Sequence, residues 1–157
     1  MDLGVEGAIV AILVLAAATV FGLVRRARDG RLRPQHPKRP RRSQGGAEGV
    51  TGGMDERLGA AEIGSRLGER ATLVQFSTAF CAPCRATRRV LGEVAGMVDG
   101  VTHVELDAES HLDLVRRLNV VRTPTVLVLD ADGRIVRRAS GAPRKADVIA
   151  ALGVATS

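Results

Sequence analysis

The pattern of apolar and polar residues divides the chain into three parts. An almost unbroken apolar stretch runs from Leu3 to Val24, and it is followed by a polar segment, residues 25–53, rich in Arg, Pro and Gly. From residue 54 onward, short apolar runs alternate with segments in which apolar residues recur at helical spacing. This alternation is typical of an α/β domain. We therefore expect an N-terminal helix, a disordered linker over 25–53 and a folded domain over 54–157.

The elements of the domain are expected in a regular alternation. Helices are predicted over residues 55–67, 84–98, 111–118 and 145–152, and strands over 71–77, 101–107, 126–129 and 134–139. Ser110 is expected to cap the helix that begins at His111. A helix between the first two strands makes them parallel, whereas a tight turn at Asp130–Gly133 makes the last two antiparallel. The expected fold is a mixed central sheet flanked by helices.

The apolar stretch at the N-terminus has the length of a membrane-spanning helix. It comprises 22 residues from Leu3 to Val24, and ~20 apolar residues are needed to cross a bilayer. A cleaved signal peptide fits less well, because Asp2 and Glu6 stand where such a peptide carries basic residues. We therefore expect a transmembrane helix over residues 3–24.

The distribution of charge predicts how such a helix is oriented. Residues 1–53 carry nine Lys and Arg, all of them after Val24, against four Asp and Glu. By the positive-inside rule the N-terminus lies outside the cell and the domain lies in the cytoplasm, as a single-pass protein of the cell membrane. The basic linker is expected to attract an anionic lipid leaflet by ~1 kcal/mol for each Lys or Arg.

A nucleic-acid partner is not expected. Residues 54–157 carry 14 basic and 13 acidic residues, so the domain is nearly neutral, and its only aromatic side chains are Phe76 and Phe80. Binding to nucleic acid usually needs a basic face and stacking aromatic residues.

The chemistry of the chain lies in its only two cysteines, Cys81 and Cys84. They stand at C-x-x-C spacing where a predicted strand leads into a helix. There the helix dipole and free backbone N–H groups favour a thiolate, so Cys81 is expected to be the nucleophile, with Cys84 in reach of a mixed disulfide on it. Cytoplasmic cysteines are normally reduced, which favours a catalytic pair over a structural staple. No metal or organic cofactor is expected beside this redox-active pair.

Two other interpretations of the cysteine pair are weaker. A structural zinc site needs four ligands, and the chain has no second cysteine pair and only three histidines. Two inert, buried thiols are the other alternative. The Ala82-Pro83 dipeptide between the cysteines fits a turn from strand to helix better than a packed interior.

A second motif, Arg122-Thr123-Pro124-Thr125, follows the cysteines about 40 residues later. The two motifs and the order of elements resemble the thioredoxin family over roughly residues 55–153. The resemblance implies a thioredoxin-like fold in which Cys81 attacks a substrate disulfide, Cys84 is the resolving thiol, and Pro124 is a cis-proline packed against the disulfide. It also places Phe80, Ala82, Pro83 and Thr123 with Pro124 on the substrate-binding surface.

Two positions depart from that resemblance. In typical thioredoxins a buried aspartate lies six positions before the first cysteine and helps to deprotonate the resolving thiol, but here that position is Gln75. His103 stands where the lysine beside that aspartate is usual. His103 is a proton acceptor in one interpretation, and an inert strand residue bonded to Gln75 in the other.

The sequence therefore predicts a membrane-tethered thiol–disulfide oxidoreductase that reduces protein disulfides on the cytoplasmic side, supplied by an unidentified electron donor. The alternative is a redox-sensing or adaptor module with low turnover, which Gln75 favours. An extracytoplasmic enzyme of reversed topology is a third interpretation, and the charge distribution opposes it.

Overall fold

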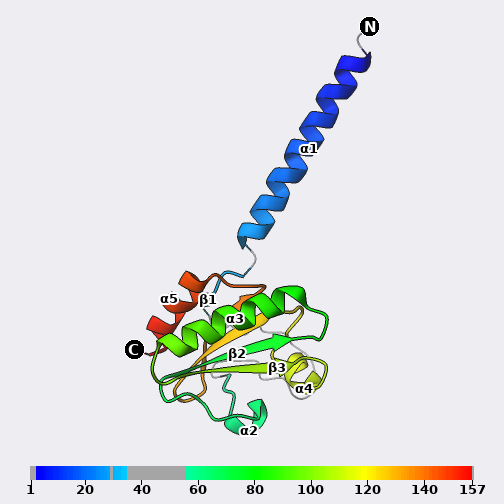
Figure 1. Ribbon diagram of the computed structural model, residues 1–157. Coiled ribbons are helices and arrows are strands. Elements are labelled where there is room, and N and C mark those ends of the chain that lie inside the picture. The colour runs from blue at the N-terminus through cyan, green and yellow to red at the C-terminus, as the bar shows by residue number, and fades with distance from the viewer. Residues whose placement is uncertain (1–2, 29, 35–55, 157) are drawn as a thin grey trace, which may run out of the picture.

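The computed structural model describes residues 3–28, 30–34 and 56–156. The helices are α1 (Leu3–Arg28), α2 (Ala60–Ile63), α3 (Ala82–Met97), α4 (Leu112–Arg117) and α5 (Lys145–Ala155). The strands are β1 (Arg33–Pro34), β2 (Ala71–Ser77), β3 (Val101–Asp107), β4 (Thr125–Asp130) and β5 (Ile135–Ser140). Figure 1 shows α1 extending away from a domain that contains all the other elements.

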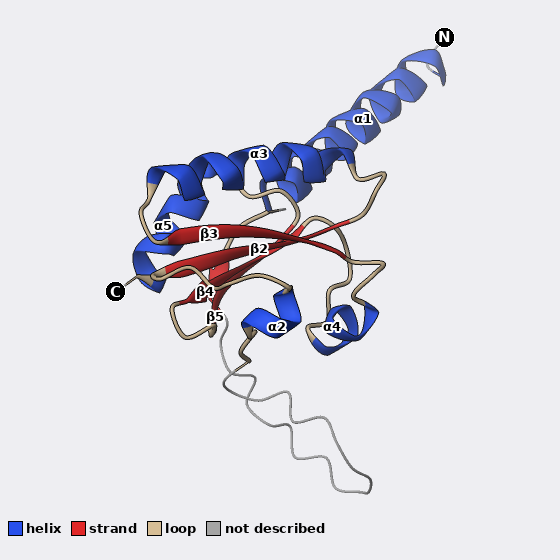
Figure 2. Cartoon of the chain, turned by 60° about the horizontal axis from the view of Figure 1, so that its bottom comes forward, coloured by secondary structure: helices blue, strands red, loops and turns tan. Residues whose placement is uncertain are grey.

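A mixed sheet forms the centre of the domain. Its strands lie in the order β1-β5-β4-β2-β3, with β2 and β3 parallel and β2, β4 and β5 antiparallel in turn. Helices α3 and α5 cover one face, while α2 and α4 lie on the other (Figure 2). The mixed, helix-flanked sheet predicted from the sequence is confirmed.

The central strands are apolar throughout because both of their faces are covered. All seven residues of β2 are buried, and so are the first five of β4. One core cluster packs Phe76 and Val74 against α2 and α4. The other contains Leu73 of β2, Leu91 of α3 and Val148 of α5, between the sheet and these two helices. Burial on both faces is the reason that these strands lack the alternation of a half-exposed strand.

The predicted helix over residues 55–67 is wrong, because α2 has only four residues. Gly59 caps its start, and Gly64 ends it in a left-handed conformation with φ 62°. Before it, the Leu58 N–H donates to the carbonyl of Gly133, 2.9 Å away. That bond ties the segment to the turn between β4 and β5, so it does not continue as a helix.

The predicted cap of α4 is also wrong. The residue at the N-cap position is His111, which makes no side-chain capping bond. The Ser110 hydroxyl donates instead to the Asp107 carboxylate, 2.5 Å away. This bond closes the turn that follows β3 and leaves the hydroxyl with no role at the helix terminus.

The N-terminal helix exposes a continuous series of apolar side chains between Ile9 and Val24. Within the described parts of the chain, no helix combines the length and the apolar character that a membrane crossing requires. The transmembrane helix predicted over residues 3–24 is therefore not supported by the structure.

The start of the predicted linker is attached to the sheet. Strand β1 pairs antiparallel with the edge of β5, and the Gly30 N–H donates to the Ser140 carbonyl, 3.0 Å away. Leu32 packs against the core cluster beneath α3 and α5. The sequence pattern did not predict this edge strand, and the rest of the linker, residues 35–53, lies outside the described residues.

Candidate active site

Cys81 and Cys84 lie where β2 leads into α3. They form a disulfide whose Cα atoms are 5.2 Å apart. Cys81 is the N-cap residue of α3 and is partly exposed, whereas Cys84 is 2% exposed and lies one turn inside the helix. An external disulfide can therefore reach the sulfur of Cys81 far more easily than that of Cys84.

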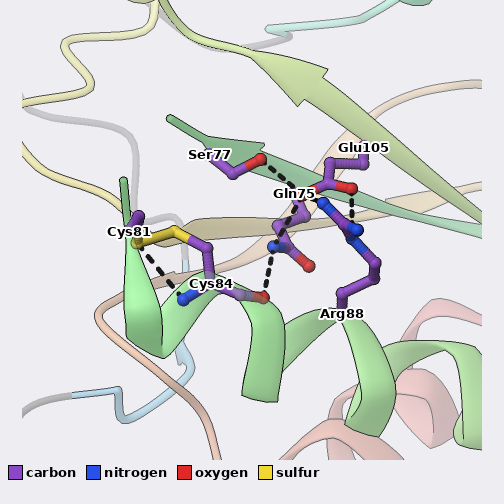
Figure 3. A network of polar contacts seen from close by, with 6 residues as sticks. All are labelled: Gln75, Ser77, Cys81, Cys84, Arg88 and Glu105. Carbon is purple, nitrogen blue, oxygen red and sulfur yellow. Dashed lines mark hydrogen bonds and ion pairs between the residues drawn. A yellow bond between two sulfur atoms is a disulfide. The ribbon is translucent and has the colours of Figure 1, made fainter. Parts of the chain in front are cut away.

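The backbone around Cys81 favours a negative charge on its sulfur. The Cys84 N–H donates to the Cys81 Sγ at 3.2 Å (Figure 3). The N-terminus of α3 adds the positive end of the helix dipole. Pro83 lies in the first turn, where its missing N–H removes no helical hydrogen bond. In the reduced protein these groups stabilise a thiolate on Cys81.

Exposed apolar side chains lie next to Cys81 in the chain. Phe80 is 98% exposed, and Ala82 and Pro83 are also exposed. Val121, which is 76% exposed, lies just before the second motif and was not predicted as a site residue. Exposed apolar side chains beside a reactive sulfur are suited to contact with a partner chain.

The loop before β4 lies beside the cysteine turn. The peptide bond between Thr123 and Pro124 is cis, and Pro124 is buried. The Thr123 hydroxyl lies 3.4 Å from that of Thr78, in the turn that leads to Cys81. The Pro124 carbonyl accepts a hydrogen bond from the Gly141 N–H at 2.7 Å. The structure thus places the second motif against the turn that leads into the cysteine motif.

Gln75 lies under the first turn of α3 and is completely buried. Its Nε2 donates to the Cys84 carbonyl at 3.0 Å and lies 3.4 Å from Oε1 of Glu105. Both neighbours are acceptors, so the amide nitrogen must face them. Among the described residues, nothing is hydrogen-bonded to the buried Gln75 Oε1.

Glu105 is the centre of a polar network that the sequence analysis did not identify. It pairs with Gln75 across the parallel strands, and its Oε1 accepts from the Ser77 hydroxyl at 2.5 Å. Arg88, one turn beyond Cys84, binds both carboxylate oxygens (Figure 3). Its Nη2 lies 2.8 Å from Oε1 of Glu105, and its Nε lies 2.5 Å from Oε2. Burial by itself raises the pKa of Glu105, but the hydrogen bonds from Arg88 and Ser77 outweigh it and hold that pKa below its usual value.

No hydrogen bond joins His103 to Gln75, so the interpretation that paired them is wrong. His103 pairs with Leu73 in the sheet, two pairs away from Gln75 and Glu105. Its Nε2 is buried and has no hydrogen-bond partner among the described residues. Burial is the main cause that lowers the pKa of His103, opposed by the charge of Glu105.

A polar cavity of about 480 Å³ opens beside the disulfide. Cys81, Cys84 and Glu105 all line it. Its other lining residues are Ser77, Thr78, Ala79, Arg85, Arg88, Asp107 and Glu109. Because the cavity is polar and much larger than one water molecule, it is suited to hold water between the cysteines and the carboxylate.

A signal for Glu105 was present in the sequence. Val104 and Leu106 face the core together, so His103, Glu105 and Asp107 lie on the opposite face of β3. Gln75 is an unusual residue in the neighbouring strand, because it is polar within an apolar run. If the two predicted strands are paired in parallel from their first residues, Ala71 and Val101, Glu105 lies beside Gln75, as it does in the structure.

Comparison with known proteins identifies relatives of this domain. The sequence model of the Thioredoxin family matches residues 61–153. The thioredoxins of Mycobacterium bovis and Mycobacterium tuberculosis are each 34% identical over 84 residues, which is 53% of this chain and 72% of theirs. A thioredoxin of Alicyclobacillus acidocaldarius is 33% identical over 86 residues, or 54% of this chain and 81% of the relative.

Solved structures give the same similarity in three dimensions. The chloroplastic thioredoxin z superposes with a TM-score of 0.51 at 25% identity, covering 64% of this chain and 92% of that one. A mutant thioredoxin from Halobacterium salinarum superposes with a TM-score of 0.51 at 16% identity, covering 57% of this chain and 77% of that one.

Proposed function

The chain belongs to the thioredoxin family and is a thiol–disulfide oxidoreductase, and we propose that it reduces disulfides in proteins. In this proposal Cys81 is the attacking thiol and Cys84 is the resolving thiol. One observation carries the assignment of roles. Cys81 is partly exposed at the N-terminus of α3 and accepts the Cys84 N–H, whereas Cys84 is 2% exposed.

The proposed reaction proceeds by two sulfur displacements. The Cys81 thiolate attacks one sulfur of the substrate disulfide, and the other substrate sulfur leaves as a thiolate that takes up a proton. The Cys84 thiol then loses its proton and attacks Sγ of Cys81. The second substrate thiolate leaves, and the Cys81–Cys84 disulfide of the structure forms. An electron donor restores the dithiol by delivering two electrons and two protons.

The exposed apolar residues around Cys81 support a protein substrate. Phe80, Ala82, Pro83 and Val121 provide contact area for an extended segment that carries the disulfide. In this proposal the backbone of Thr123, before cis-Pro124, orients that segment over the Cys81 sulfur.

Turnover distinguishes this enzyme from a redox sensor. The wild-type protein should catalyse the reduction of insulin disulfides by dithiothreitol, whereas Cys81→Ser should abolish catalysis. A wild-type protein that forms its own disulfide reversibly but does not accelerate insulin reduction would instead be the low-turnover sensor or adaptor.

We further propose that the enzyme is tethered to the cell membrane with its domain on the cytoplasmic side. The exposed apolar side chains of α1 and the basic residues that follow Val24 support this proposal. A single cysteine introduced at Gln44, in a variant lacking Cys81 and Cys84, tests it. An impermeant maleimide should label this cysteine in lysed cells but not in intact cells, and fractionation should recover the protein with the membranes. Labelling in intact cells, or recovery of the protein in the soluble fraction, would contradict the proposal.

A further inference from the structure

The resolving step requires a proton acceptor near Cys84. Its sulfur is almost fully buried, and a thiol attacks only as the thiolate. Gln75, the side chain directly beneath it, is an amide and cannot take a proton. The question of which group accepts the proton rests on the proposed function, because it concerns the release of a substrate from Cys81.

The carboxylate of Glu105 is held close to this thiol. Gln75 Nε2 bridges the Cys84 carbonyl at 3.0 Å and the Glu105 carboxylate at 3.4 Å, so Glu105 lies only one side chain away from the Cys84 backbone. Both residues also line the polar cavity beside the disulfide. Water in that cavity would connect the Cys84 thiol to the carboxylate.

Other acid–base groups are less well placed. His103 does not line the cavity, and nothing in the described chain is hydrogen-bonded to its buried Nε2. Asp107 is exposed at the end of β3, and the hydrogen bonds that its carboxylate accepts, from the Ser110 hydroxyl at 2.5 Å and the Glu109 N–H at 3.2 Å, link it to neither Gln75 nor α3. Glu109 lines the cavity, but its side chain has no connection to Gln75 or to α3 in the described residues.

We propose that Glu105, carried on β3, accepts the proton of Cys84 through water in the cavity, and that Arg88 sets the pH range over which it does so. In the step, the S–H bond of Cys84 breaks and its proton passes to the carboxylate. The Cys84 sulfur forms a bond with Sγ of Cys81 as the bond from Cys81 to the substrate breaks. Glu105 then returns the proton to the departing substrate thiolate or to solvent.

Arg88 keeps the acceptor charged. Its guanidinium binds both carboxylate oxygens while 58% of its side chain remains exposed. Without Arg88, the largest influence that opposes burial is lost, so the pKa of Glu105 rises. The other charged or titratable groups around Glu105 are Arg85 on α3, His103 and Asp107 on β3, and Glu109 after β3.

Single-turnover release of thionitrobenzoate measures the step directly. Reduced protein is mixed with dithiobis(nitrobenzoic acid). Attack by Cys81 on the reagent releases one equivalent of thionitrobenzoate, at a rate that depends on the reagent concentration. Attack by Cys84 on the resulting mixed disulfide releases a second equivalent, at a rate that does not depend on that concentration. Rates of both phases are measured across pH for the wild type, Glu105→Gln and Arg88→Gln. The matched charge controls are Glu109→Gln, and Arg89→Gln on the neighbouring helical position.

Glu105→Gln should slow the second phase by about 10²-fold at neutral pH, the lower end of the usual contribution of general base catalysis, and leave the first phase unchanged. Its second-phase rate should then rise in proportion to hydroxide. The second-phase rate of every folded variant should fall as the pH is lowered, and in Arg88→Gln this fall should occur at a higher pH than in the wild type. Both control variants should follow the wild-type profile.

Two outcomes overturn the proposal. The first is a second phase in Glu105→Gln that matches the wild type. The second is an Arg88→Gln variant whose second-phase rate falls on acidification at the same pH as that of Arg89→Gln. If circular dichroism shows that Glu105→Gln does not fold, the comparison of these two arginine variants decides the test by itself. A purely structural ion pair would change the unfolding midpoint but not these pH profiles. Loss of the first phase in the wild type would refute the proposed function instead.

Discussion

Replacing Gln75 with aspartate tests how the polar network under α3 is held together. Gln75 is completely buried, and its amide nitrogen faces two acceptors, the Cys84 carbonyl and the Glu105 carboxylate. An aspartate there cannot donate to either acceptor when ionised. It also places a second negative charge beside Glu105, so we expect Gln75→Asp to destabilise the protein although aspartate is chemically suited to proton transfer.

Two penalties determine how much stability Gln75→Asp should lose. A buried acceptor without a donor costs ~1–3 kcal/mol, and an uncompensated buried charge costs ~3–5 kcal/mol. The two penalties overlap, because the aspartate can take up a proton instead of remaining charged. We therefore expect a loss of about 3 kcal/mol at neutral pH.

The dependence on pH identifies the cause. Burial and Glu105 raise the folded-state pKa of the new carboxyl above its unfolded value of ~3.9. The destabilisation due to ionisation is then absent below the unfolded pKa, grows as the pH rises toward the folded pKa, and stays constant above it. Unfolding of the oxidised protein by urea at neutral pH and near pH 4 should show the larger loss at neutral pH.

A second substitution completes the test. Glu105→Gln removes the repelling charge and supplies an amide that can donate to the aspartate, so the double variant should recover part of the loss, with a coupling of about 1–3 kcal/mol. The reasoning would be refuted if Gln75→Asp lost the same stability at both pH values and the two substitutions were additive.

Three further predictions follow from the same structure. Alkylation of the reduced protein near neutral pH, followed by peptide mapping, should modify Cys81 before Cys84, and the opposite order would reverse their roles. Leu91→Ala should lower the free energy of unfolding by about 2–5 kcal/mol, because Leu91, on the inner face of α3, is completely buried; a loss below this range in urea unfolding would show that the core collapses around the cavity. Because Arg88 and Ser77 lower the pKa of Glu105 in the folded state, its ionised form stabilises the protein above its unfolded pKa, and this contribution disappears as the pH falls through the folded pKa. Wild-type protein should therefore lose more stability on acidification than Glu105→Gln, and equal losses would contradict the shift.

The strands and the cysteine turn were predictable because their signals are local. Residues 71–77 and 101–107 were predicted with the bounds that β2 and β3 have in the structure, since an apolar run is typical of a buried strand and the alternation of Val104 and Leu106 is typical of a strand with one buried face. Cys81 and Cys84 needed only their spacing and the helical period that follows. The cis bond before Pro124 agrees with what the family resemblance implied.

The remaining features depend on contacts between distant residues. Glu105 joins Gln75 across a pair of strands that are 30 residues apart in the chain. Strand β1 forms only because the edge of β5 is present to pair with it. The start of the predicted helix over residues 55–67 was lost to a hydrogen bond from Leu58 to a distant turn. Periodicity carries no information on such partners.

Covalent trapping tests the assigned thiol chemistry most directly. In Cys84→Ser the only remaining thiol is Cys81, so its mixed disulfide with a substrate cannot be resolved. After reduction and mixing with insulin, Cys84→Ser should accumulate a covalent adduct that mass spectrometry assigns to Cys81 and that dithiothreitol reverses, while Cys81→Ser should form far less. Folded, reduced Cys84→Ser that forms no adduct, or an equal adduct through Cys84 in Cys81→Ser, would contradict Cys81 as the attacking thiol.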